Sequence, residues 1–252
     1  MLWYKSWLET RWRFLIGLAL VILSACASVL YYPEVMKLMP LAGTLDTGGP
    51  LGQLIREQME LMREYRGYVW LQLYRQNLTQ MGTLFAVVLG SGSPLASRAA
   101  LFTLSLPASR NRVLGTRAAA GLGELFVLAF VPSLLVPLLS PAVGQSYGVG
   151  SALVHATCLF FACAAFFSLA VLLSSVFADV WRPLLIALFV AGVLNVCEQA
   201  FRGLSRYAIF GLMNGEIYFR TGSLPWAGLL VSAVASGAML YGATVRTARR
   251  DF

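Results

Sequence analysis

Few residues in this chain of 252 could carry out chemistry. The single histidine, His155, could act as the base for a serine nucleophile, and the run Gly90-Ser91-Gly92-Ser93 offers Ser91 and Ser93 in that role. One histidine cannot build a multi-histidine metal site, and the four cysteines lie in apolar stretches without a Cys-x-x-Cys pair. An intramembrane serine hydrolase is therefore the catalytic hypothesis that remains open, and we expect neither a metal site nor a disulfide framework.

The lysines argue against nucleotide binding by the chain itself. A phosphate-binding loop, Gly-x-x-x-x-Gly-Lys-[Ser/Thr], needs its lysine amine to reach the phosphates. The only lysines are Lys5 and Lys37, and neither lies in a glycine-rich context. We therefore expect the chain to bind no cofactor and to hydrolyse no ATP itself, so that any ATP and Mg²⁺ would be held by a partner. A non-enzymatic role is preferred to the serine hydrolase, whose serines and histidine are predicted to lie at opposite membrane faces, about 30 Å apart.

The composition indicates which class of protein must position these residues. Hydrophobic residues make up 58% of the chain and charged residues 12%, with a mean hydropathy of +0.72, whereas a soluble domain is about 45–50% apolar and about 25% charged. Since a membrane-crossing helix takes about 20 apolar residues, we predict one all-α integral membrane domain with about six transmembrane helices. Their approximate ranges are 14–31, 69–90, 113–139, 151–177, 183–196 and 224–245. Polar residues interrupt the second range: Arg75, Gln76, Asn77 and Gln80.

Basic residues are distributed unevenly between the two sides of the predicted membrane domain. With the N-terminus inside, the inner segments carry eleven Lys or Arg and three acidic residues, and the outer segments carry seven and six. Because cytoplasmic loops of membrane proteins are enriched in Lys and Arg, both termini are predicted to be cytoplasmic and the protein to lie in the inner membrane of the cell. This distribution explains the net charge of +8 without a nucleic-acid partner.

Two outer segments are predicted to be helical without spanning the membrane. From Leu51 to Tyr65, apolar residues recur at helical spacing between charged ones, as in an amphipathic helix on the outer surface. We interpret it as an interfacial brace, with an outer gate as the alternative. Residues 197–222 are too polar to span and too apolar to lie free in water, so a short surface or re-entrant helix is expected.

The first apolar range has features of a lipoprotein signal. Leu23-Ser24-Ala25-Cys26 resembles the lipobox of bacterial lipoproteins, whose cysteine is acylated after cleavage. The region before it contains Glu9, and the apolar run continues past Cys26 to Leu30. A retained membrane helix is therefore preferred, and a non-transporting membrane scaffold is kept as an alternative.

A few ionisable and small residues fall within the predicted spans. Glu124 lies about 16 Å into the third span, where an ionisable group needs a partner or a wet cavity, and we expect it to pair with Arg75. Glu198 and Arg202 are i, i+4 neighbours near the outer end of the fifth span, as in a local ion pair. Small residues in the third span predict a face for close helix packing: Gly115, Ala119 and Gly123.

The predicted inner loop between the second and third spans is rich in apolar residues. It reads Ser97-Arg98-Ala99-Ala100-Leu101-Phe102-Thr103-Leu104-Ser105-Leu106-Pro107-Ala108-Ser109-Arg110 and leads directly into a membrane helix. Leu and Phe exposed on a cytoplasmic loop usually require a partner surface to cover them. Contact with lipid headgroups would explain the arginines of this loop but not its Leu and Phe residues.

Part of this loop matches a known motif. Leu-Ser-Leu-Pro-Ala-Ser-Arg at 104–110, followed by Val113-Leu114-Gly115, resembles the SLPVSR…vLgK stretch of ABC-2 type transporter permeases. The motif likeness covers about residues 90–125, and the layout of six spans with an inner N-terminus is similar over the whole chain. Such permeases work as dimers with two separate ATP-binding subunits. The resemblance implies an ABC transporter permease, an exporter paired with a second copy or a paralogue, whose apolar helices suit a hydrophobic or amphipathic substrate.

By the same resemblance, residues 94–112 are the coupling element that sits in a groove of the ATPase. The residues expected to make this contact are Arg98, Leu101, Phe102, Leu106, Pro107 and Arg110. The chain departs from the family pattern in two places. Many members carry an acidic residue and a Gly-Thr pair ahead of the motif, where this chain has Ser97–Thr103, and the usual Lys after the motif glycine is Thr116, followed by Arg117.

Overall fold

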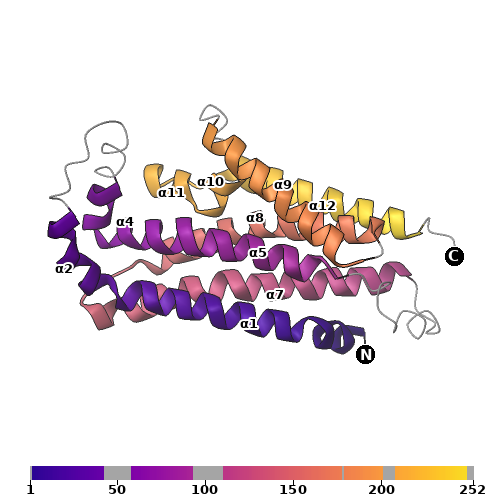
Figure 1. The fold of residues 1–252 in the computed structure, drawn as a ribbon, viewed down its shortest axis with the longest axis horizontal. Coiled ribbons are helices and arrows are strands. Elements are labelled where there is room, and N and C mark those ends of the chain that lie inside the picture. The colour runs from indigo at the N-terminus through magenta and orange to yellow at the C-terminus, as the bar shows by residue number, and fades with distance from the viewer. Residues whose placement is uncertain (1, 43–57, 93–109, 178, 201–207, 249–252) are drawn as a thin grey trace.

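The structure of the protein is a computed structural model that describes residues 2–42, 58–92, 110–177, 179–200 and 208–248, and its elements in these ranges are helices (Figure 1). Five of the helices are long and apolar enough to cross a membrane. Their membrane-length parts are Ser6–Leu30, Arg112–Val143, Val149–Val176, Trp181–Ala200 and Trp226–Thr247. The described chain is thus all-helical with multi-pass membrane character, and five of the six predicted ranges fall on these helices.

The long helices pack around α8 (Val149–Val176), which is the most deeply buried of the five. α8 contacts α7 (Arg110–Leu139) and α12 (Trp226–Ala248), and α1 (Leu2–Leu30) packs along α7. α9 (Trp181–Ala200) touches the bundle along one side only, and its buried residues are Pro183, Ala187 and Ala191. The beginning of α1 and the end of α12 lie at the same end of the bundle (Figure 1).

A sixth long helical segment runs beside α1 and α8 (Figure 1). It consists of α4 (Tyr65–Val69), the π-helix η1 (Trp70–Leu78) and α5 (Thr79–Gly90). The wider turns of a π-helix bond backbone groups five residues apart, and the Thr79 hydroxyl adds a bond of 2.8 Å to the Tyr74 carbonyl. This segment contains the predicted second span. Three of the four polar residues that interrupt the predicted span, Arg75, Gln76 and Asn77, fall in η1, and the segment is not among the five apolar candidates.

Two glycines bring α5 against α8. A Cβ atom on Gly90 would lie 2.6 Å from the carbonyl oxygen of Phe167 and 2.8 Å from Cβ of Ala170. A Cβ atom on Gly82 would lie 3.0 Å from Sγ of Cys163. α5 therefore packs closely along α8. These contacts fix the alignment of the two helices, with Gly90 beside Phe167 and Ala170 and Gly82 beside Cys163.

The end of the bundle opposite the two termini carries short helices (Figure 1). α2 (Tyr32–Ala42) follows α1, and residues 58–63 are helical before a bend at Glu64, while residues 51–57 of the predicted amphipathic helix lie outside the described part. α10 (Ile209–Met213) and α11 (Glu216–Thr221) lie in the segment expected to form a short surface or re-entrant helix. The 3₁₀ turn Ser140–Val143 ends α7.

Candidate functional site

The residues expected to contact an ATPase fall mostly outside the described structure. Arg98, Leu101, Phe102, Leu106 and Pro107 belong to residues 93–109, which are not described. Arg110 is the first residue of α7. The structure does describe both ends that hold this segment, the C-terminus of α5 with Ser91 and Gly92, and the first turns of α7.

The C-terminus of α5 is tied to two neighbouring helices by side-chain hydrogen bonds to its last carbonyl groups. Arg13 of α1 donates from Nη1 to the Val88 carbonyl at 3.3 Å, and Ser174 of α8 donates to the Gly90 carbonyl at 3.3 Å. The Ser91 hydroxyl donates to the same Val88 carbonyl at 3.1 Å. The last carbonyls of a helix carry partial negative charge and lack partners within the helix, so a guanidinium there is favourable.

A second arginine reaches the same point from α7. A Cβ atom on Gly92 would collide with Nη2 of Arg117, so the guanidinium lies directly against the backbone where residues 93–109 begin. Arg117 interacts favourably with Glu9 and Glu124 and unfavourably with Arg13. We call Arg13, Gly92, Arg117 and Glu124 the inner junction, after the side of the membrane on which the sequence predicts them to lie. Sequence reasoning noted Arg117 only as a departure from the motif, and its proximity to the glycine after α5 had no sequence signal.

Within the inner junction, Glu124 ties α7 to α1. The Thr10 hydroxyl donates to Oε1 of Glu124, while Oε2 has no hydrogen-bond partner among the described residues, and the residue is buried. The predicted pairing of Glu124 with Arg75 is wrong, because the Arg75 guanidinium lies 5.7 Å from the centre of the Trp70 ring and forms no ion pair with Glu124. The predicted span began at residue 14 and therefore left out Thr10, which is buried within the long helix α1.

The third predicted intramembrane polar residue, Glu198, holds a short helix. Its carboxylate accepts hydrogen bonds from the backbone N–H groups of Ile209 (2.6 Å) and Phe210 (3.0 Å), at the first turn of α10. It thus supplies the capping interaction that the first N–H groups of a helix require. Its expected partner Arg202 lies outside the described residues.

The stripe of Gly115, Ala119 and Gly123 is not packed against the other described residues. All three residues are exposed on α7, and a Cβ atom on either glycine would meet nothing within 4 Å. The close packing predicted from these small residues therefore needs a partner from outside the described residues.

His155 lies in a buried aromatic cluster near the N-terminus of α8. Its Nδ1–H donates to the Ser151 carbonyl at 2.8 Å, its ring stacks on Tyr74 at 4.3 Å, and Tyr218 meets it edge-on at 5.5 Å. Nε2 of His155 and the hydroxyls of Tyr74 and Tyr147 are buried and have no hydrogen-bond partner among the described residues. Burial raises the pKa of Tyr147 above its usual range, so this phenol stays protonated.

The serine and the histidine of the hydrolase hypothesis are far apart. Ser91 follows Gly90, whose carbonyl is bonded to Ser174, whereas His155 lies nineteen residues earlier on the same helix α8. At 1.5 Å per residue these two levels of α8 are about 28 Å apart. Ser91 is also fully buried and bonded to its own helix, so the described residues contain no Ser91–His155 pair, and Ser93 lies outside them.

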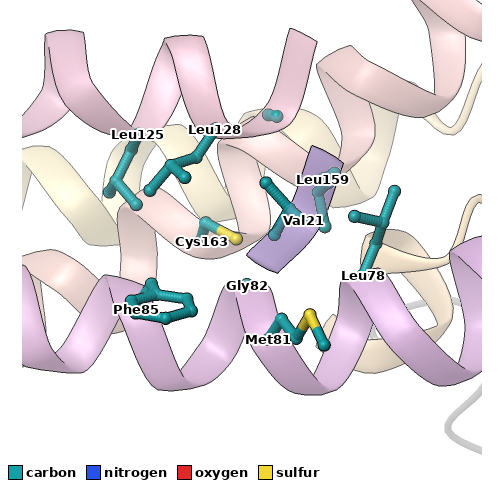
Figure 2. Close-up of a pocket in the computed structure, with 10 residues that line it drawn as sticks. Val21, Leu78, Met81, Gly82, Phe85, Leu125, Leu128, Leu159 and Cys163 are labelled. Carbon is teal, nitrogen blue, oxygen red and sulfur yellow. The ribbon is translucent and has the colours of Figure 1, made fainter. Parts of the chain in front are cut away.

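The described residues offer no metal site. They hold no cluster of three His, Cys, Asp or Glu side chains that could bind an ion. A small cavity between α1, α5, α7 and α8 is lined almost entirely by apolar side chains, among them Val21, Leu78, Phe85 and Leu128 (Figure 2). Its free volume of about 10 Å³ leaves room for no more than about one water molecule. Comparison with protein-family models, with curated proteins and with solved structures found no match.

Proposed function

We propose that the chain is the permease subunit of an ATP-driven ABC-2 type transporter, an exporter in the inner membrane of the cell. In this proposal α4, η1 and α5 together form the sixth membrane span. A separate ATPase subunit binds ATP and Mg²⁺ and contacts residues 94–112. A second copy of the permease, or a paralogue, completes the translocation path.

The inner junction is the observation that supports this proposal most strongly. The segment with the SLPVSR-like sequence leaves the bundle at Gly92 and returns at Arg110, so a partner bound to it acts directly on α5 and α7. At the same place Arg13 and Ser174 connect the end of α5 to α1 and α8. A partner that binds the segment differently in its two nucleotide states would therefore move several spans together.

The exposed faces of the bundle support a second permease chain. The stripe of Gly115, Ala119 and Gly123 has no neighbour at its glycines, and small residues allow membrane helices to approach closely. α9 is buried on one narrow side, and its outer half also exposes Asn195 and Gln199. Polar side chains on a spanning helix favour association with another helix.

The contact with the ATPase is tested by the double substitution Leu106→Asp with Arg110→Glu. It places negative charge where the proposal has apolar and cationic contacts with the ATPase, so co-purification of the ATPase should be lost while membrane insertion is kept. The matched control is Arg246→Glu on the exposed last turn of α12, which changes charge at the same end of the bundle outside the segment. Undiminished co-purification of the ATPase with the double variant would refute the assignment of residues 94–112.

A further inference from the structure

The helical segment of η1 and α5 presents two glutamines on an exposed face. Gln76 and Gln80 are four residues apart, both are exposed, and the same face continues at Leu84, which is 43% exposed. Arg75 is exposed beside them, with its guanidinium over the Trp70 ring. Residues four apart lie on one side of a helix, so the two carboxamides form a continuous polar strip. We call Gln76 and Gln80 the amide strip.

Contacts with α8 fix the level of the amide strip in the bundle. Gly82, two residues after Gln80, lies against Leu159 and Cys163 of α8. Cys163 is in the middle of α8, the most apolar of the candidate membrane spans. Gln80 is therefore near the centre of the membrane-length part of the bundle, about 15 Å from the end of α5 at Gly90.

The two carboxamides have no partners within the described chain. Each can donate two hydrogen bonds and accept two, yet neither the Gln76 nor the Gln80 side chain forms a hydrogen bond with another described residue. The neighbouring Asn77, by contrast, donates to the Ser28 hydroxyl of α1 at 3.5 Å. An amide that faces hydrocarbon without a hydrogen bond is strongly unfavourable, and polar residues at this depth generally face a wet cavity or a partner.

We propose that the amide strip lines a water-filled part of the translocation path, and that the transported solute carries hydroxyl or amide groups that bond to it. This inference rests on the proposed permease function and narrows its substrate class. A carboxamide both donates and accepts, so it suits a hydrogen-bonding solute, and the strip itself carries no acidic residue. The translocation path in this proposal is thus more polar than the apolar composition of the spans indicates. A substrate without any hydrogen-bonding group would not fit it.

The proposal is tested by measuring how fast cysteines at these positions react with a charged, hydrophilic methanethiosulfonate reagent in native membranes. The variants are Gln76→Cys and Gln80→Cys in a background where Cys26 and the exposed Cys197 are alanine, since Cys158 and Cys163 are buried. The matched control is Val234→Cys on α12, which is 70% exposed on a spanning helix without polar neighbours on its face. Unchanged thermal stability shows that the variants are folded.

The thiolate is the reacting form, and it does not form in hydrocarbon. We therefore expect both glutamine-site cysteines to react more than about tenfold faster than the control, because only water supports their ionisation. Reaction as slow as that of the control overturns the proposal. Oxidative cross-linking of Gln80→Cys to a second copy, with slow labelling, overturns it in favour of a protein contact. Co-purification of an ATPase is measured separately on the same membranes. Slow labelling of the glutamine-site cysteines with an ATPase present refutes this inference alone. Fast labelling without an ATPase refutes the proposed function.

Discussion

The contact between α5 and α8 at Gly90 predicts a large cost for one added methyl group. In Gly90→Ala the new Cβ would lie 2.6 Å from the Phe167 carbonyl oxygen and 2.8 Å from Ala170 Cβ, and neither a backbone oxygen nor a Cβ can rotate away. Overpacking of this kind costs about 1–3 kcal/mol, against a gain in helix propensity of up to about 1 kcal/mol. For a chain of this length, each kcal/mol lowers Tm by about 2–4 °C, so we expect Gly90→Ala to unfold several degrees below the unmodified protein.

Two glycines serve as graded controls in the same thermal unfolding assay in detergent. At Gly82 the added Cβ meets the ends of flexible side chains, Met213 Cε at 2.9 Å and Cys163 Sγ at 3.0 Å, so Gly82→Ala should lower Tm less. At Gly237 on α12 it meets nothing within 4 Å, so Gly237→Ala should leave Tm unchanged or raise it. A Gly90→Ala protein as stable as Gly237→Ala would refute the close packing of α5 on α8.

Three further substitutions test other contacts. Thr10→Val removes the one side-chain hydrogen bond to Glu124 that the described residues make, and should lower the free energy of unfolding by about 1–3 kcal/mol. Thr10→Ser should keep most of that stability, and equal stability of the two variants would contradict the bond. Glu198→Ala removes the acceptor at the first turn of α10 and should cost about 0.5–2 kcal/mol, with faster hydrogen exchange in residues 208–213; unchanged exchange would disprove the capping role. Gly123→Leu should weaken self-association, measured by light scattering, without changing the stability of the monomer. The control Gly237→Leu should leave self-association unchanged, and equal association of both variants would rule out the α7 stripe as an interface.

The positions of the long helices could be predicted because each depends on a long local run of apolar residues. Five predicted ranges fall on membrane-length helices. The beginning of α1 could not be predicted in this way, because the helix extends over polar residues that are stabilised by contacts with α7. Ser6 and Thr10 are buried there, and hydropathy alone assigns such residues to the solvent side.

The partners of the polar residues depend on tertiary contacts that spacing does not reveal. Glu124 was expected to pair with Arg75. It instead accepts a bond from the Thr10 hydroxyl, 114 residues away in the sequence, and interacts favourably with Arg117 of its own helix. Glu198 was expected to pair with the residue one turn along its own helix, and it accepts backbone N–H groups from α10. The π-helix had only an indirect sequence signal, the polar residues at 72–77, because it depends on a change of backbone register over Trp70–Leu78.

The most direct test of the proposed function is to purify the protein from its native membrane in mild detergent and to identify every co-purifying chain by mass spectrometry. The account predicts a roughly stoichiometric second protein with a phosphate-loop lysine motif, because the chain has only Lys5 and Lys37 and neither belongs to such a motif. A homogeneous, functional preparation without any such ATPase would contradict the account.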